Sequence, residues 1–379
     1  MSLFFLFIFA VYGGAHVYAF QRARAALAFG PAAGAVLAAF MLLMVFAPFL
    51  VRALEHHNYE FLARGFAYIA YFWMAALFLF FCGSLVLDVA GLATRAAGWM
   101  TRSDVSAFLI SARTSFWASL CLSLAICGYG YGEALHVRME RITIETTKLP
   151  AGTDRFTIVQ ISDVHLGLII RSNRFEKIME MIQAAKPDIL VSTGDLVDAQ
   201  INHLTGLGEL LRGARPKFGK YAITGNHEYY AGIDKAIAFT KNAGFTVLRN
   251  EAVTDGPITL VGVNDRTGVQ LNQEAPIDEK DLLEKLPRDK FILLMKHQPR
   301  IDRASLGLFD LQLSGHTHKG QIFPFTLVTL MTFPLNAGRY DLPMGSVLYV
   351  SRGTGTWGPP IRFLAPPEVT VIELVRKAV

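Results

Sequence analysis

The pattern of hydrophobic positions changes close to residue 138. Before it, apolar residues form long continuous runs, and after it they form runs of four to eight residues between turns and amphipathic segments. A helix needs about 20 apolar residues to cross the hydrocarbon core of a bilayer. Short apolar runs bounded by turn residues are typical of buried strands. We therefore predict a transmembrane domain at 1–137 and a folded domain after it.

Four of the long runs predict an all-α transmembrane region of four helices, at 3–20, 31–51, 65–92 and 106–129. The first run could also be a cleavable signal peptide. It has no positively charged start and three more runs follow it, so we favour a retained helix. Basic residues are balanced between the two sets of loops, so the positive-inside rule does not decide which side of the membrane carries the second domain.

The composition agrees with a chain that lies partly in lipid. Of its 379 residues 52% are hydrophobic and only 18% are charged, against about 25% charged in soluble proteins. The formal net charge is +5, but many arginines flank the apolar runs, where charge at the membrane surface explains them. We therefore expect no nucleic-acid partner. All three cysteines lie in apolar runs, which argues against a disulfide framework or a cysteine metal site.

The second half predicts an α/β domain. Residues 138–155 form a linker with a first strand in "RITIETT", and the domain proper covers 156–379. Helical patterns such as "RFEKIMEMIQAAK" and "DKAIAFTKNAG" alternate with strand-like segments, which favours layers of helices and sheets. The predicted strands are "FTIVQISD", "DILVSTGD", "KYAITGNHE", "ITLVGVND", "FILLMKHQP", "FDLQLSGHTH", "SVLYVSRG" and "VTVIELV".

Five of these strands end in residues suited to metal binding or proton transfer. In chain order these residues are Asp163 and His165, Asp195, Asn226 and His227, His297, and His316 and His318. A single Asp or His after a strand is often only a turn residue. Sites in α/β sheets gather outside the carboxyl ends of strands, so five such ends in one domain predict a shared metal site.

The ordered set D-x-H, G-D, G-N-H-E, H and G-H-x-H resembles the calcineurin-like metallophosphoesterase superfamily over Phe156 to Leu374. The resemblance implies a four-layer α-β-β-α sandwich with a two-metal centre at the strand ends. It also implies a role for each residue of the five blocks. Asp163, His165 and His318 would bind one metal, Asn226, His297 and His316 the second, Asp195 would bridge both, and His227 would stay off the metals and face the substrate.

This set of residues suits phosphoester hydrolysis. Two divalent ions about 3.5–4 Å apart can supply a bridging hydroxide as nucleophile and relieve charge on the phosphoryl oxygens. Imidazole and carboxylate ligands suit manganese, which we favour, but also iron, zinc or nickel. His227 could protonate the leaving alkoxide or hold a phosphoryl oxygen. The predicted cofactor is therefore a pair of divalent metal ions.

Each of four further polar residues could have either of two roles. Asp198 could cap a helix or orient a ligand, and Glu228 could bond a ligand histidine or face water. Arg352 and Arg362 could grip a phosphate or headgroup of the substrate, although a surface ion pair is the commoner role of arginine.

The segment "LYVSRGTGTWGPPIRFLAPPEVTVIEL" is similar to a membrane-attached bacterial branch of the superfamily. That branch includes enzymes that cleave UDP-diacylglucosamine, and an animal transmembrane metallophosphoesterase has a comparable architecture. The resemblance implies a multi-pass protein of a bacterial-type inner membrane. Four spans exceed what an anchor needs, so we predict a lipid-linked phosphodiester or pyrophosphate as substrate.

Two alternatives to a lipid-linked substrate remain: a soluble phosphoester with the helices as an anchor only, and a non-catalytic scaffold or transporter. The apolar stretch "IFPFTLVTLMTFPL" at 322–335 bears on this choice. It is too short and too interrupted by proline to span a bilayer. It could be buried core, or an apolar segment beside the metals that dips into the membrane.

Overall fold

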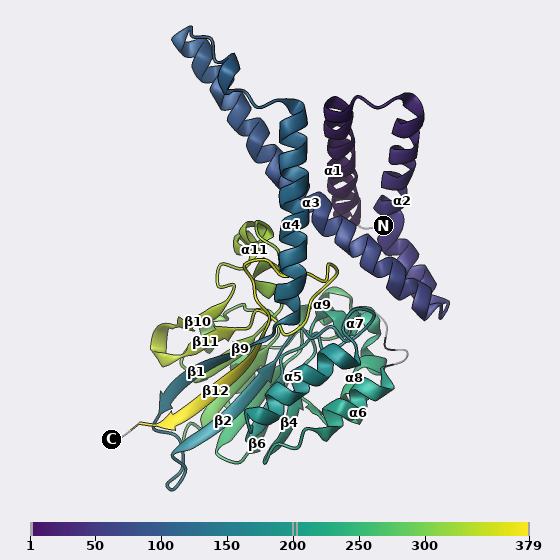
Figure 1. The fold of residues 1–379 in the computed structure, drawn as a ribbon. Coiled ribbons are helices and arrows are strands. Elements are labelled where there is room, and N and C mark those ends of the chain that lie inside the picture. Colours follow the sequence, from purple (N-terminus) through teal and green to yellow (C-terminus); the bar gives the residue numbers. More distant parts are fainter. Residues whose placement is uncertain (1–2, 199–200, 202–203, 378–379) are drawn as a thin grey trace. The chain divides into compact units, whose positions relative to one another are not determined.

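The computed structural model describes residues 3–198, 201 and 204–377. The chain divides into two compact units. The first extends to Gly132 and also includes the short segment Gly358–Ile361, and the second contains the remainder. Helices make up the first unit and two β-sheets with their covering helices make up the second (Figure 1).

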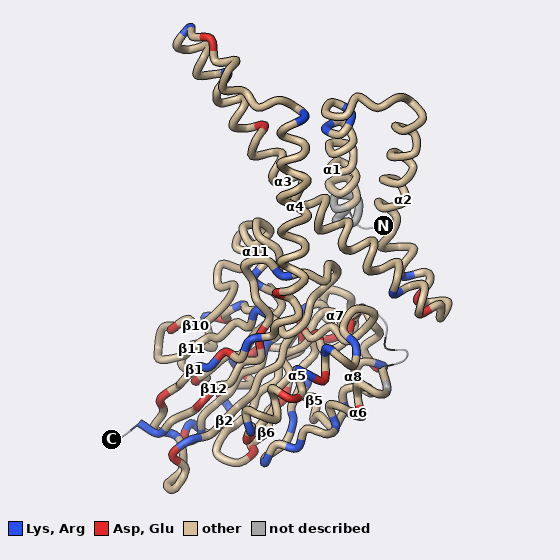
Figure 2. The backbone as a smooth tube through the Cα atoms, viewed as in Figure 1, with Lys and Arg blue, Asp and Glu red and all other residues tan. Residues whose placement is uncertain are grey.

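Four long helices form the first unit: α1 (Leu3–Leu27), α2 (Pro31–His56), α3 (Glu60–Thr101) and α4 (Ala112–Leu135). Each of α1, α2 and α3 contains one of the predicted apolar runs and extends beyond it, whereas α4 begins at Ala112, inside the fourth predicted run at 106–129, and extends past its end. Figure 2 shows that long stretches of these helices carry no charged residue. Within the described residues, three segments are long and apolar enough to cross a membrane: Pro31–His56, Glu60–Thr101 and Ser106–Leu135.

Two mixed sheets of six strands form the centre of the second unit. The first has the order β1-β12-β2-β3-β4-β5 and the second the order β10-β11-β9-β8-β7-β6. The first sheet comprises β1 (Arg138–Thr146), β12 (Glu368–Arg376), β2 (Arg155–Ile161), β3 (Ile189–Ser192), β4 (Gly219–Ala222) and β5 (Thr246–Val247). The second comprises β10 (Gly338–Asp341), β11 (Val347–Val350), β9 (Leu311–Ser314), β8 (Phe291–Lys296), β7 (Ile258–Val263) and β6 (Glu251–Asp255). Every strand predicted from the sequence is present.

The core between the sheets explains why the strands are so apolar. Ile158 and Val191 of the first sheet and Leu293 and Leu313 of the second belong to one buried cluster. Strands buried on both faces read as continuous apolar runs rather than alternating ones. This accounts for segments such as "FILLMK" in β8, in which five of the six residues are buried.

Helices cover the outer faces of both sheets. On the first sheet they are α5 (Ser172–Ala184), α6 (Thr205–Gly213) and α8 (Ile233–Asn242), seen in front of the strands in Figure 1. On the second, α10 (Glu279–Glu284) contributes Leu283 to a cluster with Val261 and Ile292. The order helix, sheet, sheet, helix is the predicted layered architecture.

The strand directions bring the predicted site residues to one edge. β2, β3 and β4 are parallel neighbours in the first sheet, and β8 and β9 are parallel neighbours in the second. Parallel neighbours end at the same edge, so the loops that follow these five strands lie together. All eight residues singled out in the sequence are in these loops or at the start of α7 (Asn226–Ala231).

Of the two interpretations of residues 322–335, the structure excludes buried core for most of the stretch. Ile322 is buried, but Phe325–Thr332 form a helix, α11, in which none of the residues is buried. Its large side chains are exposed although they are apolar.

Candidate metal centre

The structure brings together three groups of His and Asp side chains whose ligand atoms lie within 4.8 Å of one another. The groups are Asp163, His165 and His318; His165, Asp195 and His227; and Asp195, His297 and His316. The groups share His165 and Asp195, so they form one continuous cluster. Both Asp side chains, His165 and His297 are at most 2% exposed, and His318 and His227 are also buried, which excludes a solvated surface patch.

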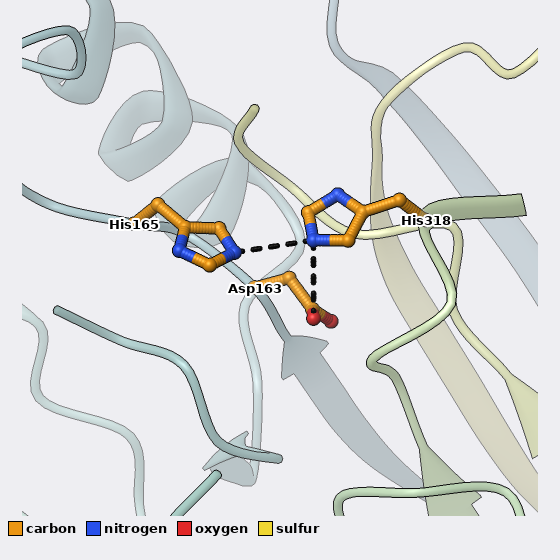
Figure 3. Close-up of side chains that lie close together, drawn as sticks. All are labelled: Asp163, His165 and His318. Atoms are coloured by element: carbon orange, nitrogen blue, oxygen red, sulfur yellow. Dashed lines mark hydrogen bonds and ion pairs between the residues drawn. The ribbon is translucent and has the colours of Figure 1, made fainter. Parts of the chain in front are cut away.

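Asp163, His165 and His318 converge from two loops, one after β2 and one after β9 (Figure 3). Nε2 of His165 lies 3.1 Å from Nε2 of His318, and Nε2 of His318 lies 3.3 Å from Oδ1 of Asp163. The carboxylate of Asp163 is fixed in turn, because it accepts hydrogen bonds from the backbone N–H of His316 and the hydroxyl of Ser162.

Asp195, Asn226, His297 and His316 form the other end of the cluster. Nε2 of His297 lies 3.2 Å from Oδ2 of Asp195, from Oδ1 of Asn226 and from Nδ1 of His316. Nδ1 of His297 lies 2.8 Å from the carbonyl oxygen of Thr193 and donates to it. That hydrogen bond places the ring proton on Nδ1, so the lone pair of Nε2 is free and points at the cluster.

These distances fit residues that share metal ions. Ligand atoms bound at about 2.1 Å to one ion in tetrahedral or octahedral geometry are about 3.0–3.4 Å apart. The spacings of 3.1–3.3 Å within the two groups match this range. Two acceptor nitrogens 3.1 Å apart would otherwise repel each other. The donor set, imidazole nitrogens with carboxylate and amide oxygens, suits a divalent transition metal.

Asp195 lies between the two groups. Its Oδ2 is 3.2 Å from Nε2 of His297 and 3.9 Å from Nε2 of His165. Its Oδ1 accepts a 2.8 Å hydrogen bond from the backbone N–H of His227. One carboxylate therefore faces ligands of both groups, which is the position that a bridging ligand needs.

The backbone at the cluster is strained. Asp163, His165, Asp195, His316 and His318 all have positive φ values, between 48° and 71°. A left-handed conformation is unfavourable for a residue with a Cβ, and such residues concentrate at functional sites. This strain was not predictable from the residue types. It is a signal of function independent of the residue types.

Two motif glycines are required by close packing. A Cβ on Gly225 would overlap Oδ1 of Asp195, and a Cβ on Gly315 would overlap Oδ2 of Asp163 and Oγ of Ser162. The glycine before Asn226 and the glycine before His316 therefore let the two loops approach the carboxylates. Any larger residue would displace a ligand.

His227 belongs to the second of the three groups and bonds Asp198. Nδ1 of His227 is 3.1 Å from Oδ1 of Asp198, and the rings of His227 and His165 meet edge to face at 4.5 Å. Burial lowers the pKa of His227, but the carboxylates of Asp195 and Asp198 outweigh it and raise that pKa to about 9. In contrast, burial lowers the pKa of His165 to about 3, so this imidazole is neutral and free to bind a cation.

Glu228 has a role that neither sequence reading anticipated. It is 2% exposed, and its carboxylate accepts hydrogen bonds from the backbone N–H groups of Gly225, Asp195, Leu196 and Val197. It thus joins the loop that carries Asp195 to the loop that carries Asn226. Asp198 lies near two histidines: its Oδ1 is 3.1 Å from Nδ1 of His227 and 3.9 Å from Nδ1 of His165, one of the predicted metal ligands.

Both arginines proposed as substrate contacts have other partners. Arg362 is fully buried, donates to the carbonyl oxygens of Arg352 and Gly355, and has Nη2 3.1 Å from Nδ1 of His318. Arg352 forms ion pairs with Glu140 and the buried Glu368. Arg362 therefore supports the loop around His318 from inside, and neither arginine enters the proposed mechanism.

Aromatic residues near His227 were missed in the sequence. The ring of Tyr230 lies 5.5 Å from the ring of His227, and that of Trp357 lies 6.2 Å from it. Both side chains are about half exposed, at 50% and 52%. The motifs "NHEYY" and "GTGTWGPP" contain them, but nothing in the spacing linked the two segments.

Comparisons with known proteins agree with this geometry. Residues 156–320 match the family model of the calcineurin-like phosphoesterases. A metallophosphoesterase of Aquifex aeolicus is 40% identical over 259 residues, which cover 68% of this chain and 98% of that one. A Bacillus subtilis metallophosphoesterase is 36% identical over 65% of this chain and 90% of its own length. A zebrafish (Danio rerio) transmembrane protein with a metallophosphoesterase domain is 30% identical over 68% of this chain and 62% of its own.

The fold, the clustered ligands and these relatives define the class of the protein. The chain belongs to the calcineurin-like metallophosphoesterase family. It is a metal-dependent phosphoester hydrolase with helices long and apolar enough to span a membrane.

Proposed function

We propose that this protein is a membrane-bound phosphoesterase with two metal ions, which hydrolyses a phosphodiester or pyrophosphate bond in a lipid-linked substrate. The observation that carries the proposal is the convergence of the seven predicted ligands, Asp195 among them, with neighbouring ligand atoms 3.1–3.9 Å apart. We further propose that α1 spans the membrane with the other three helices, in a bacterial-type inner membrane.

In this proposal the residues divide into two ligand sets. Asp163, His165 and His318 hold one ion, Asn226, His297 and His316 hold the other, and Asp195 contacts both. Two divalent cations, with manganese favoured by the mixed nitrogen and oxygen donors, would supply an activated water and neutralise charge on the phosphoryl group. The neutral amide of Asn226 adds a ligand without adding negative charge, which keeps the site attractive to phosphate.

His227 would act on the leaving group. With a pKa raised to about 9 it carries a proton at neutral pH, and Asp198 fixes the proton at Nδ1 so that Nε2–H is the group available to substrate. A protonated imidazole can donate to the departing oxygen or hold a phosphoryl oxygen. General acid catalysis contributes about 10²–10⁴-fold in rate.

A non-catalytic scaffold or transporter fits these observations less well. Five left-handed backbone positions and two buried carboxylates each cost folding free energy, and a binding surface gains nothing from them. A soluble phosphoester remains the second candidate for substrate, since the metal chemistry would be the same.

The test uses the full-length protein in detergent, loaded with manganese. We expect hydrolysis of bis(p-nitrophenyl) phosphate, loss of it in Asp195→Asn, and full activity in Asp289→Asn, which changes an exposed aspartate outside the cluster. Wild-type activity in Asp195→Asn would refute the central role of this residue.

Incubation with a fractionated lipid extract then addresses the substrate. Phosphoester lipids that disappear with the wild type but not with Asp195→Asn would support the lipid-linked substrate. Turnover of only water-soluble phosphoesters would favour the second candidate.

A further inference from the structure

An exposed apolar surface borders the metal centre. The residues of α11 and the segment just before it include no charged side chain, and Figure 2 shows the helix without charge. Met331 is 86% exposed and Leu327 is 56% exposed. We define the apolar rim as α11 and its neighbours with exposed large side chains: Phe323, Phe325, Leu327, Val328, Leu330, Met331, Trp357 and Leu364.

The rim is built onto the loop that carries the metal histidines. The hydroxyl of Thr326 donates to the carbonyl oxygen of Lys319, and the hydroxyl of Thr317 donates to that of Asn336. After α11 the chain returns to the site, where the ring of Phe333 lies 5.1 Å from the ring of His316. Both ends of α11 are therefore tied to the loop between His316 and Gly320.

A second segment joins the rim from the other side of His318. Gln321 bonds the backbone of Trp357 in both directions, with its amide donating to the carbonyl oxygen and its oxygen accepting from the N–H. The backbone N–H of Phe323 donates to the carbonyl oxygen of Phe363, next to the exposed Leu364. The ring of Trp357 lies near that of His227, and the ring of Phe333, the residue after α11, lies near that of His316, so the rim and the chain that leaves it adjoin the site at two histidines.

The short connection to the membrane helices indicates what covers the rim. Only His136 and Val137 separate the end of α4 from the start of β1. Three peptide units span at most about 11 Å, so β1 begins within that distance of the end of a candidate membrane span. For a domain attached this close to a bilayer, lipid is the nearest apolar partner.

The chemistry of the rim fits a bilayer better than a protein partner. Interfacial segments place Phe, Leu and Trp in the boundary between headgroups and acyl chains. Protein interfaces usually surround an apolar centre with a polar border. The stretch 322–335 has neither acidic nor basic residues, while a cation, Lys319, precedes it, and Arg300 lies over the ring of Phe333 at 4.7 Å. Basic groups at that border favour anionic headgroups.

We propose that the apolar rim inserts into the bilayer that the protein's own helices span, and that it brings the metal centre to the phosphate groups of membrane lipids. This inference rests on the proposed function for its substrate but not for the insertion itself. Lipid headgroups would then reach the site from the membrane surface without leaving the bilayer.

The experiment places one fluorescent label on the full-length protein in nanodiscs of phosphatidylcholine and phosphatidylglycerol. The background replaces Cys82, Cys121 and Cys127 by alanine, and an environment-sensitive dye is attached to Met331→Cys or to Leu327→Cys. Met344→Cys is the matched control, because Met344 is 77% exposed but lies between β10 and β11. Hydrolysis of bis(p-nitrophenyl) phosphate confirms that each labelled protein is folded.

We expect lipids with a doxyl group on the acyl chain to quench both rim labels at least about twofold more than the control label, because the rim lies at acyl-chain depth. Equal, weak quenching at all three positions would overturn the proposal. The readout uses no substrate, so it is independent of the proposed function. Quenched rim labels in a protein that hydrolyses no lipid would instead count against the lipid-linked substrate.

A second measurement links insertion to turnover. In the double variant Leu327→Glu, Met331→Glu, we expect the ratio of lipid hydrolysis to bis(p-nitrophenyl) phosphate hydrolysis to fall at least about tenfold, since carboxylates disfavour insertion. In Met344→Glu the ratio should equal that of the wild type. An unchanged ratio in the double variant would show that the rim does not present lipid to the site.

Discussion

The pair formed by His227 and Asp198 allows a quantitative prediction about pH. The pKa of His227 is raised to about 9, so its protonated form dominates below that pH and is lost as the pH rises through it. If this proton is needed for catalysis, kcat/KM falls on the alkaline side near that value. Asp198→Asn removes one of the charges that raise the pKa, so the alkaline limb must move to lower pH.

The size of the shift follows from the geometry. An opposite charge within hydrogen-bonding distance changes a pKa by about 1–3 units. The Asp198 side chain is 34% exposed, and solvent screening places the effect at the low end, about one unit. With pKa values of about 9 and about 8, Asp198→Asn would have roughly a third of wild-type kcat/KM at pH 8.5 and nearly all of it at pH 6.5.

The assay is a pH profile of kcat/KM with bis(p-nitrophenyl) phosphate and saturating manganese, for the wild type, Asp198→Asn and His227→Gln. Asp289→Asn serves as the charge-matched control outside the site. The alkaline limb of the profile should move only in Asp198→Asn. It should disappear in His227→Gln, whose kcat/KM should be about 10²–10⁴-fold below that of the wild type. A limb at the same pH in wild type and Asp198→Asn, or one that survives in His227→Gln, would refute the assignment of the acid.

Three further predictions concern the support of the centre. Glu228→Ala leaves four backbone N–H groups without their acceptor and should lower the free energy of unfolding by at least about 2 kcal/mol, measured as a reduced Tm with reduced metal content. Gly315→Ala should abolish activity, because the new Cβ would overlap the side chain of Asp163. Gly213→Ala should retain activity, because a Cβ there would meet no neighbouring side chain within 4 Å. Equal activities of the two variants would contradict the packing argument. Removal of the metal by chelation should lower the Tm, because the buried carboxylates of Asp163 and Asp195 lose their counter-charge. Added manganese should restore the Tm, and a Tm unchanged by chelation would count against bound metal.

The sequence predicted the sheets and the cluster well because both depend on local patterns. Strands such as β3 and β8 are buried on both faces, and Asp195 and His297 follow within three residues of their ends. The carboxyl ends of parallel strands share an edge, so a residue's place after its strand predicts its neighbours in space.

The parts that were missed depend on contacts between distant segments. Glu228 bonds backbone groups 31–33 positions away, and a sequence does not show which amides a carboxylate will meet. Arg362 was taken for a residue that contacts substrate, but the fold encloses it next to His318. The choice between core and exposed segment for residues 325–332 also stayed open, because an apolar run alone does not show whether the sheets bury it.

The strand order of the first sheet has a consequence for how the protein is made. β12 lies between β1 and β2 and pairs with both, and Glu373 of β12 forms ion pairs with Arg141 of β1 and Arg155 of β2. During translation β1 and β2 emerge long before β12, so both keep an unpaired edge until Glu368–Arg376 has been made. Completion of this sheet is therefore a late folding step, and a nascent chain that stops before Glu368 would keep these edges open to aggregation and proteolysis.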